Sequence, residues 1–154
     1  MKPNIVQKPA FRVVGLKYRG KNENGEVPQL WREFWPRHDE IPQRAPVNVS
    51  YGVIDHFDEV SGAFDYIAGV EVTDDDEVPE GMTAVDVPEQ MYAVFDCTLP
   101  TLMEAIQFAY GEWLPGSGYV REEGPEFELY DERFDVSQEK YGMSIYIPVR
   151  KATA

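Results

Sequence analysis

The sequence predicts an α+β fold of two pseudo-symmetric βαββ modules, each an antiparallel sheet with one helix, closing on a central cleft. Segments rich in β-branched and aromatic residues alternate with single helical segments, which is typical of mixed sheets. This order of elements occurs twice in the 154 residues, and recurrence of several elements in one order indicates a duplication. The length fits one compact domain, residues 1–154.

The first repeat is expected at about 4–73. It begins with a strand over 6–18, followed by a Gly- and Asn-rich turn. A helix should begin at Pro28, because proline suits a first helical position. Its apolar face is formed by Leu30, Trp31, Phe34, Trp35 and His38. Strands over 47–56 and 64–72 complete this repeat.

An acidic run at about 74–81 is expected to be a solvated linker, since it begins Asp-Asp-Asp-Glu. The second repeat, about 82–150, starts with a strand over 83–98 that has a kink near Pro88. A helix follows Pro100, with Thr101 and Glu104 in capping-box spacing. Strands over 127–134 and 141–149 complete the pattern.

The charge of the chain is strongly acidic. Lys and Arg number 14 against 28 Asp and Glu, a formal net charge of −14. Nucleic-acid affinity depends on clustered cations that neutralise phosphates, so no direct nucleic-acid binding is expected. The same field attracts cations. The sequence shows no apolar run of membrane-spanning length, and its single cysteine, Cys97, cannot form an internal disulfide. A cytoplasmic protein without membrane contact is therefore expected.

The two repeats differ at positions that indicate a binding slot. Gly52 and Gly69 of the first repeat align with Glu128 and Tyr146 of the second. A strand glycine often marks close approach by a ligand or by another backbone. Alternation alone leaves Glu128 two interpretations, a site residue or an ordinary solvent-facing strand residue.

Alternation also makes a prediction about the two faces of the last sheet. One set of side chains is expected to face the second helix: Phe127, Leu129, Met143, Ile145 and Ile147. The other set is expected to face away from it: Glu126, Glu128, Tyr130, Ser144 and Tyr146.

These motifs resemble the GyrI-like small-molecule-binding domain, also called the AraC-type effector-binding domain, a SOUL-like duplicated βαββ fold. The resemblance covers nearly the whole chain. It rests on the duplication, on Tyr-Gly-Val at 51–53, on Tyr-Gly-Glu-Trp-Leu-Pro at 110–115 followed by Ser-Gly-Tyr at 117–119, and above all on Phe-Glu-Leu-Tyr at 127–130. The family glutamate pairs with cationic, often aromatic, ligands at the floor of the cleft. The resemblance implies that Glu128 has this role.

The resemblance also implies a choice of biological roles. Members are fused to DNA-binding helices, act alone to sequester toxic compounds or modulate a partner, or, in one branch, hydrolyse reactive cyclopropane-bearing drugs. No residues remain for a helix-turn-helix, so the stand-alone form is expected. Aromatic side chains would supply cation–π contacts and apolar area. The candidates for the wall are Trp35, Tyr51, Tyr110, Trp113, Tyr130 and Tyr146, although aromatic residues at helical spacing are usually core residues.

The sequence lacks the motifs of metal sites, phosphate-binding loops and catalytic triads. His38 and His56 have no second ligand at a zinc spacing, the acidic run lacks the spaced oxygens of a calcium loop, and Gly-Ser-Gly at 116–118 lacks the Lys-Ser/Thr ending of a phosphate loop. No metal or cofactor is expected, and no serine or cysteine triad is evident.

Three hypotheses about function remain. The first is a binding protein for hydrophobic or aromatic cations. The second is a hydrolase of a reactive electrophile that uses Glu128 with Tyr130 or Tyr146. The third is a modulator whose acidic surface binds a basic protein partner.

Overall fold

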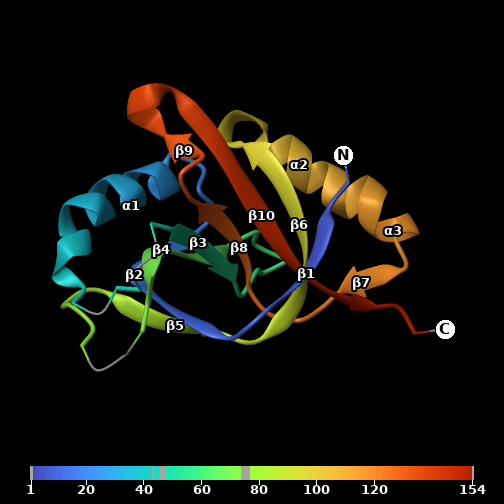
Figure 1. Ribbon diagram of the computed structural model, residues 1–154, viewed down its shortest axis with the longest axis horizontal. Helices are drawn as coiled ribbons and strands as arrows, with labels where there is room; N and C mark the ends of the chain where they lie inside the picture. Colours follow the sequence, from blue (N-terminus) through green and yellow to red (C-terminus); the bar gives the residue numbers. More distant parts are fainter. Residues whose placement is uncertain (1, 43, 46–47, 74–76, 154) are drawn as a thin grey trace. The chain divides into compact units, whose positions relative to one another are not determined.

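The computed structural model describes residues 2–42, 44–45, 48–73 and 77–153, and the chain forms two compact units. Unit 2 spans Phe11–Val87, and unit 1 contains the residues before Phe11 together with those from Pro88 onward (Figure 1). The first three residues of the acidic run, 74–76, lie outside the described residues. Within the described ranges, no helix is long and apolar enough to span a membrane.

Unit 2 is a four-stranded antiparallel sheet with one helix. The strands follow the order β3-β4-β2-β5. Its elements are β2 (Phe11–Gly20), α1 (Glu26–Phe34), β3 (Ser50–Asp55), β4 (Phe64–Val72) and β5 (Thr83–Val87). A tight helical segment, Trp35–Glu40, continues α1. Leu30 and Phe34 of α1 are buried against β2 and β4, beside Val14 and Tyr66.

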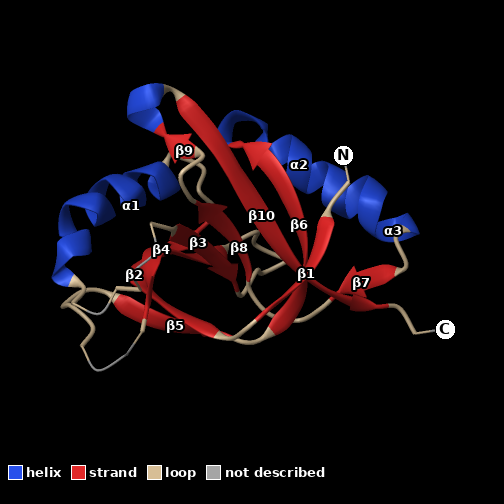
Figure 2. Cartoon of the chain, in the orientation of Figure 1, coloured by secondary structure: helices blue, strands red, loops and turns tan. Residues whose placement is uncertain are grey.

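Unit 1 repeats this plan, with the strand order β8-β10-β6-β1 and with two short strands that also pair with β10. The strands are β1 (Asn4–Lys8), β6 (Gln90–Thr98), β7 (Tyr119–Arg121), β8 (Glu126–Tyr130), β9 (Phe134–Asp135) and β10 (Lys140–Lys151). The helical segments are α2 (Leu102–Phe108), a π-helical turn Ala109–Trp113 and α3 (Leu114–Gly116) (Figure 2). The α+β class and the repeated βαββ order are confirmed.

Two predicted strands are each divided in two, and their pieces belong to different units. The predicted strand 6–18 is interrupted at Pro9 between β1 and β2, and the strand 83–98 is interrupted at Pro88 between β5 and β6. Proline cannot donate to a ladder, so these positions end continuous pairing. Beyond these breaks the pieces join different sheets: β1 pairs with β6 in unit 1, whereas β5 pairs with β2 in unit 2. Each sheet therefore takes its outer strand from the other repeat.

The helices differ from expectation at their ends. The first begins at Glu26, after Gly25 with a positive φ of 75°, and its α-helical part ends at Phe34. Pro36 has no N–H for the i−4 carbonyl, so the α-helical pattern gives way to the 3₁₀ segment. In unit 1 the reciprocal capping box joins Thr98 and Thr101, not Thr101 and Glu104.

Candidate functional site

The face of the sheet to which Glu128 points follows from strand register. Glu128 lies opposite Ile145, and Ile145 lies opposite Phe95. Directly opposed residues of antiparallel strands project to one face. Ile145 and Phe95 belong to the apolar cluster that packs against α2 and the turn after it. Glu128 therefore points to the helix-covered face of unit 1.

This register corrects the predicted orientation of β8. Phe127 lies opposite Tyr146, so Phe127 and Leu129 occupy the face away from the helix, and the prediction that they face it was wrong. The prediction failed because Phe127, Glu128 and Leu129 are all buried. A strand covered on both sides shows no alternation in burial, and sequence alternation alone cannot say which of its faces meets the helix.

Glu128 is a buried carboxylate held by a neighbouring tyrosine. Its exposed fraction is 7%, and the Tyr130 hydroxyl donates a 2.7 Å hydrogen bond to its Oε1 atom. The two residues are separated by one position of β8 and so share a face. The Tyr130 ring is in edge-to-face contact with Phe134, 4.9 Å between centroids. Because an unsatisfied buried carboxylate is costly, this hydroxyl is an important part of the site.

The charge of Glu128 affects the pKa of the Cys97 thiol. Cys97 lies opposite Met143 and so on the same helix-covered face. Burial, and then the charges of Glu128 and Asp96, raise the pKa of the Cys97 thiol to about 11. The thiol is therefore protonated at neutral pH and is not an activated nucleophile.

A second polar cluster on the same face joins Tyr110, a predicted wall residue, to Glu126 and Arg121, which were not predicted as site residues. The Tyr110 hydroxyl donates to Oε1 of Glu126 at 3.3 Å and accepts a 3.0 Å hydrogen bond from Nε of Arg121. Burial raises the pKa of Glu126, an effect that the Arg121 charge and the Tyr110 hydrogen bond oppose. Burial also raises the pKa of Tyr110 to about 12, so this phenol stays protonated. The available signal in the sequence was Glu126 itself, two positions before Glu128.

Trp113 and Tyr146, two predicted wall residues, lie on different faces of the sheet. Trp113 packs edge-on against Phe95 at 5.6 Å and stacks on Tyr119 at 5.9 Å, within the helix-side core. Tyr146 is on the opposite face of the sheet from Glu128, stacked on Phe127 with 4.6 Å between centroids. Burial raises the pKa of Tyr146.

The remaining predicted residues belong to unit 2. Tyr51 is buried, and its hydroxyl donates to Oε1 of Glu71 at 3.2 Å. Gly52 is in β3, opposite Ala68. Trp35 is 46% exposed and stacks on Trp31 at 5.8 Å.

Gly69 has a structural reason to be glycine. A Cβ atom added there would lie 2.3 Å from the backbone oxygen of Val14, and the position directly opposite Gly69 in β2 is Gly15. The close approach is therefore made by the neighbouring strand, one of the two causes that a strand glycine indicates.

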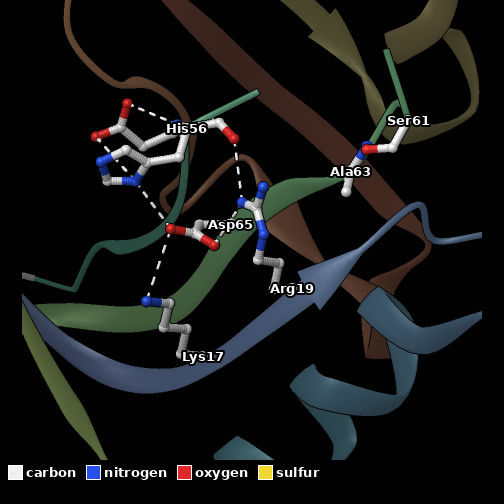
Figure 3. Close-up of polar contacts among 7 residues, drawn as sticks. Lys17, Arg19, His56, Ser61, Ala63 and Asp65 are labelled. Atoms are coloured by element: carbon white, nitrogen blue, oxygen red, sulfur yellow. Dashed lines mark hydrogen bonds and ion pairs between the residues drawn. The ribbon is translucent and has the colours of Figure 1, made fainter. Parts of the chain in front are cut away.

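Unit 2 also contains a compact ionic cluster around Asp65 (Figure 3). Asp65 accepts a 2.9 Å hydrogen bond from Arg19 and lies 3.6 Å from Lys17 Nζ and 2.8 Å from His56 Nδ1. Burial alone would raise the pKa of Asp65, but hydrogen bonds from Arg19 and His56 and the charge of Lys17 outweigh it, and the net effect lowers the pKa. Asp65 is thus already satisfied by cations of its own chain. Among the described side chains, no group of three or more His, Cys, Asp or Glu is arranged to hold a metal ion.

Comparison with known proteins identifies the family. The family model of Cass2, integron-associated effector binding protein, matches residues 4–149. The transcriptional regulator BrlR of Pseudomonas aeruginosa is 39% identical over 152 residues, which is 97% of this chain and 56% of BrlR. The chain thus spans a little more than half the length of that relative.

Solved structures share the fold. The integron cassette protein of Vibrio cholerae aligns with a TM-score of 0.71 at 19% identity, covering 97% of this chain and 96% of that one. The structure of SAV2435 bound to tetraphenylphosphonium aligns with a TM-score of 0.75 at 17% identity, covering 97% and 94%. The match of the family model over nearly the whole chain, with 39% identity to BrlR, shows that the chain belongs to the Cass2 family of effector-binding proteins.

Proposed function

We propose that this member of an effector-binding family binds hydrophobic or aromatic cations and that Glu128 recognises their charge. The observation that carries the proposal is the buried Glu128 carboxylate, which the Tyr130 hydroxyl contacts at 2.7 Å. A carboxylate in such a place has lost much of its hydration, and a cationic ligand restores favourable interactions that water no longer provides. SAV2435, which shares the fold, was solved with a bulky aromatic cation bound.

The charge of the whole chain supports the same class of ligand. A formal net charge of −14 creates a negative potential that raises the local concentration of cations. Sequestration and effector sensing both follow from such binding, and relatives such as BrlR are transcriptional regulators.

Binding of a matched pair of compounds tests the role of Glu128. Methyltriphenylphosphonium is a cation, and triphenylphosphine oxide is a neutral molecule of similar shape. Because Glu128→Gln removes the charge but keeps the shape, we expect it to weaken binding of the cation by about 10- to 100-fold and to leave the neutral compound nearly unchanged. Titration calorimetry measures both affinities.

Glu104→Gln is the matched control, since Glu104 is an exposed acid on α2 and its substitution makes the same change in net charge. It should leave both affinities unchanged. Equal affinity of the wild-type protein for the cation and the neutral compound would contradict the proposal.

A hydrolase that uses the same residues is the alternative. The Tyr130–Glu128 hydrogen bond joins a proton donor to a carboxylate, the minimum for acid–base catalysis. Glu128 and Tyr146 point to opposite faces of the sheet, so the alternative rests on Tyr130. A time course with an electrophilic compound in excess over protein distinguishes the two functions. A binding protein sequesters at most one equivalent of the compound, whereas an enzyme continues to form product until the compound is consumed.

A further inference from the structure

We propose that Gln90 and Tyr92 of β6 form an internal polar site that holds one buried water molecule. The water accepts a hydrogen bond from the Tyr92 hydroxyl, donates one to Oε1 of Gln90, and so fastens the loop 122–125 to the sheet of unit 1. The site lies on the face of the sheet away from α2, and the inference does not depend on the function proposed for Glu128.

Two buried polar atoms of β6 have no hydrogen-bond partner within the described residues. They are the hydroxyl oxygen of Tyr92 and Oε1 of Gln90. Tyr92 is fully buried, with an exposed fraction of 0%. Most buried polar groups of folded proteins are hydrogen-bonded, and an unpaired one costs free energy, so each of these atoms requires a partner.

The hydrogen-bonding requirements of the two atoms are complementary. Burial raises the pKa of Tyr92 to about 12, so its hydroxyl is protonated at neutral pH and has a proton to donate. Nε2 of Gln90 donates a 2.7 Å hydrogen bond to the carbonyl of Glu123, which fixes the orientation of the amide. Oε1 of Gln90 is therefore an acceptor that requires a donor. A water molecule can accept from the first atom and donate to the second.

Strand geometry and the segment before β8 bring the two head groups to one region. Gln90 and Tyr92 are separated by one residue of β6, so they project to the same face with Cα atoms about 6.5 to 7 Å apart. The Tyr92 ring packs against Phe127, near the start of β8, with 5.2 Å between centroids. The Gln90 amide reaches the same region, because Glu123 and Phe127 lie on either side of the short segment that leads into β8.

The loop 122–125 is held close to both side chains. Arg121 donates to the carbonyl oxygens of Glu122 and Gly124, and its positive charge lowers the pKa of Tyr92, an effect that requires the guanidinium to be near the phenol. A Cβ atom added at Gly124 would lie 2.8 Å from Oε1 of Gln90, so the amide packs directly against the loop backbone. Because both unpartnered oxygens are inaccessible to solvent, their partner must be small, which favours a trapped water over a larger ligand.

A high-resolution crystal structure tests the site directly. We expect an isolated peak of electron density within about 3.2 Å of both the Tyr92 hydroxyl oxygen and Oε1 of Gln90. The absence of a peak, a direct hydrogen bond between the two side chains, or density for a larger molecule would each overturn the inference.

Tyr92→Phe tests the inference in solution, because it removes only the hydroxyl group. If a water satisfies this hydroxyl, the variant loses a hydrogen bond, and the equilibrium constant of unfolding in urea should increase about fivefold or more. An unchanged or lower constant would show that the hydroxyl has no partner and would overturn the inference. Tyr141→Phe is the control, since it removes the same group from a residue that is 36% exposed, and it should change the constant less than twofold.

A double-mutant cycle tests whether one water joins the two residues. Gln90→Met removes both polar atoms of the side chain and keeps its length. Once either variant has lost the bridge, the second substitution costs less, so the double variant should be less destabilised than the product of the two single effects by about threefold or more. Additive effects would mean that the two atoms are satisfied separately and would overturn the shared site. If Tyr92→Phe does not fold, the crystal structure of the wild-type protein decides the question.

Discussion

The thiol of Cys97 provides a direct test of the charge at Glu128. The negative charge of Glu128 disfavours the thiolate and is one cause of the raised pKa of Cys97. Glu128→Gln removes that charge, so the pKa of Cys97 should fall. Arg133 acts with the opposite sign, because its positive charge lowers the pKa of the same thiol, so Arg133→Gln should raise it.

The magnitude follows from the pKa itself. The Cys97 pKa is raised from 9.0 to about 11, and two units correspond to an approximately 100-fold lower thiolate fraction at neutral pH. Burial is the largest cause of the raised pKa and persists in the variant. Glu128→Gln should therefore increase the thiolate fraction of Cys97 at neutral pH by about tenfold or less. A cation bound beside Glu128 should act in the same direction as the substitution.

Alkylation by iodoacetamide measures these changes, because the thiolate is the reactive form and Cys97 is the only cysteine. The pKa is read from the dependence of the rate on pH, which separates ionisation from steric access. A pKa that stays the same or rises in Glu128→Gln would refute the assignment of Glu128 to this face of the sheet, and a pKa that falls in Arg133→Gln would contradict the stated effect of the Arg133 charge.

Two further predictions concern stability and are measured by urea unfolding. Gly69→Ala should destabilise the protein by about 3 kcal/mol or more, because the added methyl group meets the Val14 backbone at 2.3 Å and a central strand must shift. Gly111→Ala is the control and should stabilise the protein slightly, because a Cβ atom added at Gly111 has no neighbour within 4 Å. An equal effect of the two substitutions would contradict this reasoning. Asp65→Asn should cost about 1 to 3 kcal/mol at neutral pH, against about 1 kcal/mol or less for Asp86→Asn in an exposed pair. Folding lowers the pKa of Asp65, so the contribution of Asp65 to the free energy of unfolding is present above the unfolded pKa of about 3.9 and is lost as pH falls through the folded pKa. If the wild-type protein remained more stable than Asp65→Asn below that pH range, the stabilising role of the Asp65 charge would be contradicted.

Much of the fold was predictable because periodicity and prolines encode it locally. The strand expected over 64–72 coincides with β4 (Phe64–Val72), and the second helix was placed correctly after Pro100. The exchange of β1 and β5 was not predictable, because Pro9 and Pro88 show where pairing stops but not which sheet each piece joins. Strand exchange is decided by contacts between segments far apart in the sequence.

The candidate site was predictable only in part for the same reason. The Phe-Glu-Leu-Tyr motif indicated Glu128, and the structure adds the Tyr130 hydrogen bond to it. The orientation of β8 depended on its register with β10, which no local pattern encodes when both faces of a strand are buried. Glu126 was missed because its partners, Tyr110 and Arg121, come from a helical turn and a short strand elsewhere in the chain.

The origin of β1 and β5 restricts how this chain can be divided. Cleavage within the acidic run would yield two polypeptides, each of which lacks the outer strand of its own sheet and carries the outer strand of the other. Each piece would expose unpaired backbone on β2 or β6, an edge that promotes aggregation. Mixing the two fragments should restore the strand pairing in both sheets. The protein is therefore suited to fragment complementation, although neither fragment contains all the strands of one sheet.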